Sequence, residues 1–203
     1  MTMQPTKLAP VDRIVLVPRW AGAAGDDFYP WVAEQLPGIE VAICALAPSP
    51  RSPAVADTTA ALATVLGRDP ARLATTIVVG HSVGGQAAMR TLPALAPGLR
   101  VRGLLYVAGW WSVDRPWDAL LPWQAEFDWA ALADRVGAVR VVISDDDPYT
   151  SDWQTTRQLF EQRVAATVIV VPGARHFNAA QQPQVLTELA AMGASRFDRP
   201  GDA

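Results

Sequence analysis

The sequence has little of what marks secreted, membrane-spanning or nucleic-acid-binding proteins. Its single cysteine, Cys44, cannot form an internal disulfide and lies in an apolar stretch, which indicates a buried, inert thiol. No apolar run reaches the roughly 18 residues of a membrane span, and the first residues lack the apolar run of a signal peptide. The net charge of -3 offers no broad basic surface for phosphate backbones or anionic lipids. We therefore expect a soluble, cytoplasmic protein that binds neither nucleic acid nor membranes.

The chain also lacks internal repeats and low-complexity tracts that would divide it. Its 203 residues are enough for one domain with a substantial core and few for two. We predict a single domain over residues 1–203, with its core at about 13–192 and a polar, frayed tail at 195–203.

Short apolar segments alternate with segments of helical spacing. The apolar segments show no polar alternation, which indicates strands buried on both faces. Strands are predicted at 13–18, 41–46, 75–79, 101–109, 139–144 and 167–172, and helices at 26–36, 53–67, 82–95, 127–136, 151–163 and 183–192. Six alternations of strand and helix predict an α/β fold with a six-stranded, mostly parallel sheet and helices on both faces.

A glycine-framed serine follows the third predicted strand. Ligands of such sheets bind beyond the carboxyl ends of the strands, which is where Ser82 is placed. The run Gly80-His81-Ser82-Val83-Gly84 matches the nucleophile elbow G-x-S-x-G, in which a strained serine projects its hydroxyl from the sheet. The amide of Val83, at a helix N-terminus, can then stabilise an oxyanion. A phosphate-binding loop is the alternative, but neither G-x-G-x-x-G nor the P-loop lysine is present.

A serine nucleophile needs a base, and the chain has only two histidines. His81 adjoins Ser82 on the turn, so its side chain should point away from the hydroxyl. His176 follows the last predicted strand, which ends at Pro172, and so belongs to the same edge of the sheet. A solvated surface histidine is the alternative.

Three acids follow the fifth predicted strand: Asp145, Asp146 and Asp147. We choose Asp147 to orient the histidine because Pro148 makes the next turn rigid, with Asp146 as second choice. The alternative is a solvated turn that caps the next helix. A metal site is not expected, since calcium loops space their ligands at alternate positions and no histidine or cysteine cluster indicates zinc.

The order Ser82, Asp147, His176 is that of α/β-hydrolases. With "IVLVP" opening the fold, "GHSVGGQAAMR" at the elbow, "DDDP" after the fifth strand and "RHF" near the end, the sequence resembles this superfamily, and within it the small serine hydrolases related to retinoblastoma-binding protein nine. The resemblance implies a six-stranded core, no large cap domain, a triad of these three residues, and hydrolysis of esters or related acyl bonds without a cofactor.

The chain departs from this family at two places. In the loop after the first strand it has Arg19 and Trp20 where relatives tend to have glycines. By analogy this loop supplies the second oxyanion N–H, and Trp20 is the candidate. Arg175 stands where the family has glycine before the histidine, and it either places a cation at the pocket rim or points into water.

Eight tryptophans are many for this length, and several follow predicted strands. The predicted substrate-binding residues are Arg19, Trp110, Trp111 and Trp153. Plain packing is the alternative for these rings, and it is the interpretation that we prefer for Trp31 and Trp129. The segment 109–123, rich in tryptophan and proline, follows the fourth strand and could shield a site only partly.

The resulting hypothesis is a serine hydrolase, esterase-like, that acts through an acyl-enzyme on a small-molecule acyl substrate, with no metal and no cofactor. Acyl transfer, cyclisation and thioester cleavage share that intermediate and stay open. A hydrolase-fold interaction protein with a closed pocket is the rival from another class. Homodimer formation stays open as well.

Overall fold

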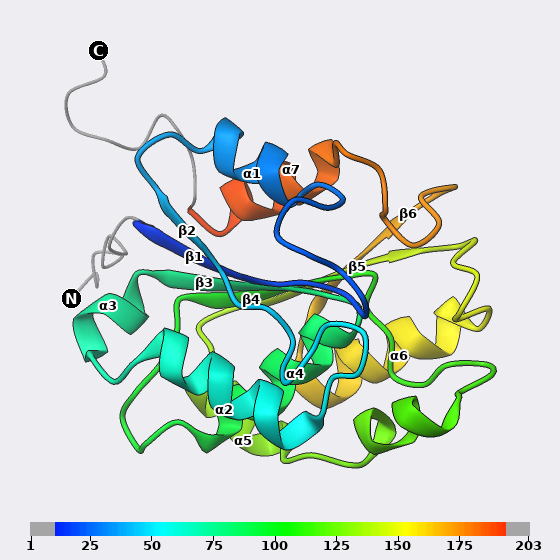
Figure 1. Ribbon diagram of the computed structural model, residues 1–203, viewed down its shortest axis with the longest axis horizontal. Helices are drawn as coiled ribbons and strands as arrows, with labels where there is room; N and C mark the ends of the chain where they lie inside the picture. Colours follow the sequence, from blue (N-terminus) through cyan, green and yellow to red (C-terminus); the bar gives the residue numbers. More distant parts are fainter. Residues whose placement is uncertain (1–10, 194–203) are drawn as a thin grey trace, which may run out of the picture.

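Six parallel strands form one sheet in the order β2-β1-β3-β4-β5-β6 (Figure 1). The computed structural model describes residues 11–193, so the predicted tail at 195–203 lies outside the described residues. The strands are β1 (Arg13–Val17), β2 (Glu40–Ile43), β3 (Thr76–His81), β4 (Gly103–Val107), β5 (Val139–Ser144) and β6 (Thr167–Val171). The α/β prediction is confirmed, and within the described residues every pairing between named strands is parallel.

Each predicted helical segment contains a helix. The helices of the described residues are α1 (Tyr29–Gln35), α2 (Val55–Leu66), α3 (Pro70–Ala74), α4 (Val83–Thr91), α5 (Trp129–Arg135), α6 (Trp153–Val164) and α7 (Pro183–Ala191), with two 3-10 helices, η1 (Leu92–Ala94) and η2 (Asp118–Gln124). The short helix α3 was not predicted. It begins where the Asp69 carboxylate accepts a hydrogen bond from the amide of Ala71, with Pro70 in its first turn.

Helices cover both faces of the sheet, with α1 and α7 on one side and α2, α4, α5 and α6 on the other (Figure 1). The sequence of strand β1 is continuously apolar because both faces of the strand are buried. Ile14 and Leu16 pack in the cluster beneath α1 and α7, whereas Val15 and Val17 pack in the cluster beneath α2 and α4. Both sides of the strand therefore lose contact with water.

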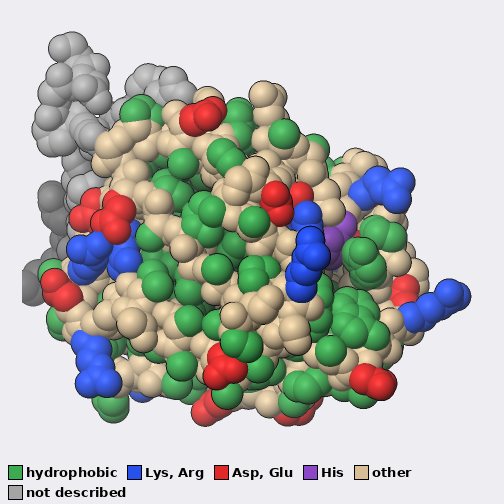
Figure 2. Space-filling view, in the orientation of Figure 1, with side chains coloured by type: hydrophobic (Ala, Val, Ile, Leu, Met, Phe, Trp, Pro, Cys, Tyr) green, Lys and Arg blue, Asp and Glu red, His purple; other side chains and the backbone are tan. Residues whose placement is uncertain are grey.

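Cys44 lies in the second of these clusters, and its burial raises the pKa of the thiol. The sequence-based interpretation as a buried, unreactive thiol agrees with this position. Within residues 11–193, no helix is both long and apolar enough to cross a membrane. On the face drawn in Figure 2, basic and acidic side chains are interspersed.

The strand order reverses at β1, which is flanked by β2 on one side and β3 on the other. The chain leaves β1 to build β2 and returns to pair β3 with the opposite edge of β1. The connections after β1 and β3 therefore diverge at the carboxyl end of the sheet and leave a crevice between them, as is typical of ligand sites in open α/β sheets.

Candidate active site

Ser82 joins β3 to α4 in a sharp turn. Its backbone has φ of 52° and ψ of −117°, a left-handed conformation that is strained for a residue with a side chain. The amide of Ser82 donates to the carbonyl of Val107, which ties the turn to β4. The serine side chain is thereby presented at the carboxyl edge of the sheet, as the elbow motif predicts.

The glycines around Ser82 allow strand and helix to approach closely. A Cβ on Gly80 would overlap the backbone of Gly85 in α4, and a Cβ on Gly84 would overlap the carbonyl of Val17 in β1. Glycine at these positions lets the first turn of α4 lie directly against β1 and β3. The positive end of the helix thus comes to the crevice between the connections that follow β1 and β3.

His176 and Asp147 are brought together from the loops that follow β6 and β5. The Nδ1 atom of His176 lies 2.7 Å from Oδ2 of Asp147, and both side chains are buried. The other carboxylate oxygen of Asp147 accepts from the amide of Tyr149 at 2.9 Å. One oxygen therefore orients the ring while the other is held by the turn that Pro148 makes rigid.

The two acids before Asp147 hold the same loop by its backbone. Asp145 accepts from the amide of Gly173 at 2.9 Å, and Asp146 accepts from the amide of Arg175 at 2.7 Å and from the hydroxyl of Ser144 at 2.6 Å. The Ser144 hydroxyl and then the Arg175 amide lower the pKa of the Asp146 carboxyl. The alternative interpretation supposed that these carboxylates cap the next helix, but they do not.

The cap of α6 is instead Asp152, whose side chain accepts from the amide of Thr155. Within the described residues, no group of three or more His, Cys, Asp or Glu side chains is placed so that it could hold a metal ion.

Ser82 and His176 line one cavity of about 280 Å³. Within residues 11–193 the serine hydroxyl makes no hydrogen bond, so it stays available to a ligand, and His176 presents its Nε2 edge away from Asp147. Catalytic hydrogen bonds are often long before a ligand binds and shorten in the complex. The structure of residues 11–193 thus brings Ser82 and His176 to one cavity but shows no hydrogen bond between them.

Two backbone amides next to the cavity are free of acceptors within the described chain. Val83 is the first residue of α4, and Trp20 lies in the loop after β1; both residues line the cavity with Ser82. Arg19 frames the second amide: its guanidinium donates to the Trp20 carbonyl at 3.0 Å and pairs with Asp27 at 2.7 Å. An oxyanion beside Ser82 can be stabilised by these two N–H groups.

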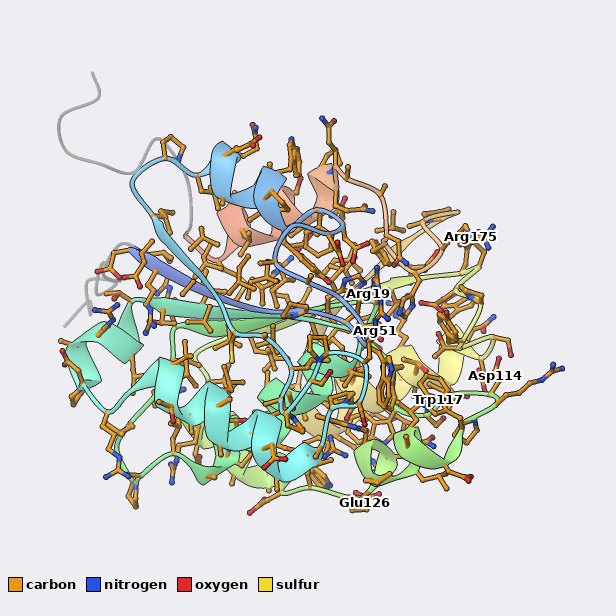
Figure 3. The ribbon with its side chains drawn as sticks, viewed as in Figure 1. Arg19, Arg51, Asp114, Trp117, Glu126 and Arg175 are labelled. Carbon is orange, nitrogen blue, oxygen red and sulfur yellow. The ribbon has the colours of Figure 1, made fainter. Side chains whose placement is uncertain are left out.

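The cavity has mostly apolar walls. It is lined by Arg19, Trp20, Ala21, Ser82, Val83, Trp110, Val113, Trp117, Leu120, Tyr149, His176 and Asn178. Of the predicted substrate-binding residues, Arg19 and Trp110 are here. Trp117 was not singled out, although it lies in the segment 109–123; its ring packs edge-on against Trp20, with centroids 5.3 Å apart. In Figure 3, Arg19 and Trp117 approach the same end of the sheet from different elements.

Two other predicted pocket residues lie elsewhere. Trp111 packs against Phe160, with ring centroids 5.2 Å apart, and beneath the guanidinium of Arg163. Trp153 packs against the core at the start of α6. These two rings pack against the core and do not line the Ser82 cavity. Trp129 is among the exposed large apolar residues, whereas Trp31 is partly buried against the core.

Arg175 points outward from the loop after β6 (Figure 3) and does not line the Ser82 cavity. It lines a second hollow, which shares Tyr149 and His176 with the Ser82 cavity. Tyr149 was also not singled out. Its ring packs edge-on against His176, with centroids 4.7 Å apart, and Tyr149 lines both hollows. Its place directly after "DDDP" is the signal that could have identified it.

The segment 109–123, which we expected to shield the site only partly, is held in place by burial and hydrogen bonds. Leu120 and Trp123 of η2 are buried, and the guanidinium of Arg90 donates to the carbonyls of Trp123 and Ala125 at 2.5 and 2.6 Å. These bonds fix the end of the segment to α4 and leave Trp117 at the cavity mouth.

Residues 14–192 match the sequence profile of the family described as serine hydrolase. No curated protein sequence matches the chain.

Solved structures share the fold. The ydeN gene product of B. subtilis is similar with a TM-score of 0.79 and 20% identity, over 91% of this chain and 100% of that one. Est1E from Butyrivibrio proteoclasticus has a TM-score of 0.63 and 14% identity, over 91% and 86%. YbtT, described as the type II thioesterase of the yersiniabactin pathway, has a TM-score of 0.61 and 19% identity, over 93% and 95%. At these identities the likeness supports the fold.

Proposed function

The chain belongs to the serine hydrolase family, and from this premise we propose that it cleaves a carboxylic ester or a related acyl bond through Ser82, His176 and Asp147. One observation carries the proposal. The ring of His176 is held by Asp147 at 2.7 Å, and His176 lines the same cavity as Ser82. This placement supports Ser82 as the nucleophile, His176 as its base and Asp147 as the acid that orients the base.

In the proposed reaction, the Ser82 hydroxyl oxygen attacks the acyl carbon while Nε2 of His176 takes its proton. The amides of Val83 and Trp20 stabilise the negative oxygen of the tetrahedral intermediate. Collapse of the intermediate breaks the bond to the leaving group, which takes the proton from His176. Water then attacks the acyl carbon and gives a proton to His176. The second tetrahedral intermediate breaks its bond to the Ser82 oxygen, which takes that proton back from His176, and the acid is released. Asp147 keeps the imidazole in one tautomer throughout.

The cavity walls indicate the kind of acyl group. Trp20, Trp110, Trp117 and Leu120 supply apolar surface, and the charge of Arg19 is offset by Asp27. A volume of about 280 Å³ accommodates a compact apolar or aromatic acyl group. Esters and thioesters of such acids are the substrates that we propose, since both give the same acyl-enzyme.

The non-catalytic alternative depends on a closed site. The open cavity beside Ser82, with a hydroxyl free of protein partners within residues 11–193, favours the enzyme over that alternative.

A fluorophosphonate probe tests the proposal, because it reacts with an activated serine. We expect labelling of the wild-type protein, loss of labelling in Ser82→Ala, and unchanged labelling in Ser112→Ala, a change at an exposed serine outside the cavity. Nitrophenyl esters and acyl thioesters of graded length, assayed on the same variants, then identify the preferred leaving atom and acyl length. Labelling that survives in Ser82→Ala contradicts the assignment, and a wild type that is neither labelled nor active favours the interaction protein.

A further inference from the structure

The second histidine of the chain is fully buried and is not part of the proposed reaction. His81 packs between the rings of Phe28 and His176, with centroids 5.3 and 5.5 Å away. Both of its ring nitrogens make short contacts. Nδ1 lies 2.7 Å from the hydroxyl of Tyr29, and Nε2 lies 2.9 Å from the backbone carbonyl of His176. The imidazole thus bridges two elements that are distant in the sequence.

The chemistry of the partners determines where each proton lies. A carbonyl oxygen can only accept, so Nε2 of His81 carries a hydrogen and donates it to His176. In the neutral ring Nδ1 is then bare and accepts from the hydroxyl of Tyr29. The oxygen of Tyr29 in turn accepts from the amide of Arg19 at 3.1 Å. One directed chain of hydrogen bonds therefore runs from Arg19 through Tyr29 and His81 to the carbonyl of His176.

This chain of hydrogen bonds joins the two loops on which the proposed reaction depends, the loop after β1 and the loop after β6. At one end, the amide of Arg19 and the carbonyl of Trp20 are both held, the latter by the Arg19 guanidinium, so the Trp20 amide between them is fixed. At the other end, His176 lies between Arg175 and Phe177, whose φ values of 51° and 55° are strained for residues with side chains. A strained loop keeps one conformation only where its surroundings impose it.

We infer that His81 and Tyr29 are a positioning pair. Together they hold the Trp20 amide and the His176 ring in the positions around Ser82 that the reaction requires. The inference rests on the proposed function, because it assigns the pair a role in that reaction. His81 is suited to the task by its place in β3, next to the nucleophile: the strand that carries Ser82 also carries the group that locates the other two loops. Neither side chain lines the cavity, so both act through the residues that they hold.

The hydroxyl of Tyr29 can be removed with little change of shape. In Tyr29→Phe the Arg19 amide loses its acceptor and Nδ1 of His81 loses its donor. With a nitrophenyl ester we expect kcat to fall about 10- to 100-fold while KM stays within about threefold, because a displaced oxyanion donor acts on the transition state. The affinity for an alkylboronic acid, which forms a tetrahedral adduct with the serine, should fall by a similar factor.

Tyr106→Phe is the matched control. Tyr106 is as buried as Tyr29. Its hydroxyl accepts from Gln86 at 3.1 Å and donates to the Trp110 carbonyl at 3.5 Å, without contacting either loop. Both variants lose a bonded, buried hydroxyl and should lose similar stability, but Tyr106→Phe should keep kcat within about twofold of the wild type. If Tyr29→Phe matches this control in kcat and boronate affinity, the pair has a structural role only and the inference is overturned.

Replacements of His81 test the two hydrogen bonds of its ring separately. Glutamine keeps an N–H that can reach the carbonyl of His176, whereas leucine keeps only the bulk. We expect His81→Gln to retain at least tenfold more kcat than His81→Leu. If His81→Leu does not fold, a double-mutant cycle of Tyr29→Phe and His81→Gln still tests the coupling between the two residues. Coupled residues give effects on kcat that do not add. Additive losses in kcat contradict the inference.

One readout is independent of activity. The native sequence has only two histidines, so ¹⁵N spectra of histidine-labelled, tag-free protein resolve both rings. We expect His81 to show a protonated Nε2 and a bare Nδ1 at neutral pH, and Tyr29→Phe to shift the Nδ1 signal. A protonated Nδ1 overturns the inference even in an active enzyme. Conversely, an inert wild type with the expected tautomer contradicts the proposed function and leaves the hydrogen-bond chain established.

Discussion

Asp147 and His176 are joined by a hydrogen bond of 2.7 Å although they follow different strands, β5 and β6. The contact is supported on both sides, since Asp145 and Asp146 bind the amides of Gly173 and Arg175 in the loop that carries the histidine. The acid turn thus acts as a scaffold for the whole loop, and one of its three carboxylates is directed at the ring.

The first prediction concerns that carboxylate. Asp147→Asn should lower kcat about 10³- to 10⁴-fold, because an amide NH₂ facing Nδ1 favours the tautomer whose Nε2 is protonated and cannot take the serine proton. Asp146→Asn keeps an acceptor for the Arg175 amide and should stay within about tenfold of the wild type. Steady-state kinetics with a nitrophenyl ester provides the measurement. Equal losses in the two variants would show that the turn matters only as a scaffold.

The second prediction concerns the elbow. Gly84→Ala should destabilise the fold by about 3 kcal/mol, because its Cβ would overlap the carbonyl of Val17 and separate α4 from β1. Gly25→Ala is the control: its Cβ would meet open space, so the free energy of unfolding should change by less than about 0.5 kcal/mol. Urea denaturation of both variants measures the difference. A Gly84→Ala variant as stable as Gly25→Ala would refute the close approach.

The third prediction concerns the cavity mouth. Trp117 is 42% exposed, so Trp117→Ala should cost little stability but remove one apolar wall beside Trp20. We expect KM for aromatic acyl esters to rise about three- to tenfold, with little change for acetyl esters, which are too small to reach this wall. Trp129→Ala removes a ring that is 38% exposed and lies outside the cavity, and it should leave both KM values unchanged. Equal effects of the two variants would exclude Trp117 from the acyl site.

The fourth prediction concerns stability and pH. Burial, followed by repulsion from His176, holds the pKa of His81 well below its usual value. The unfolded chain therefore binds a proton near pH 6.5 that the folded protein does not, and the stability from this residue, fully present above that pH, is lost as the pH falls below it. The slope is about 1.4 kcal/mol per pH unit until the folded pKa is reached.

The measurement compares urea denaturation of wild type and His81→Gln at pH 7.5 and pH 5.5. Carboxylates titrate in both proteins, so the difference between the two isolates His81. We expect the wild type to lose about 1 kcal/mol more than the variant between these pH values. Parallel losses would mean that His81 takes up its proton in the folded state as readily as in the unfolded one.

Much of the architecture was predictable because it depends on local pattern. The six strands and six of the helices follow from apolar runs and helical spacing, and the edge at which the site lies follows from the parallel sheet. The expected pocket residues were less predictable. Trp111 and Trp117 occupy one segment without regular spacing, so nothing in the sequence indicates which ring faces the cavity. The choice among Asp145, Asp146 and Asp147 had a local basis only in Pro148.

By itself, the sequence determined the order of strands and helices, the glycine-framed turn at Ser82 and the small set of residues able to act with it, because burial and backbone conformation act over short distances along the chain. Only the tertiary structure decided that Trp117 and Tyr149 face the cavity in place of Trp111 and Trp153, and that Tyr29, His81 and the His176 carbonyl form one chain of hydrogen bonds. Those relations join loops that are far apart in sequence, and the orientation of each loop is set by what it packs against.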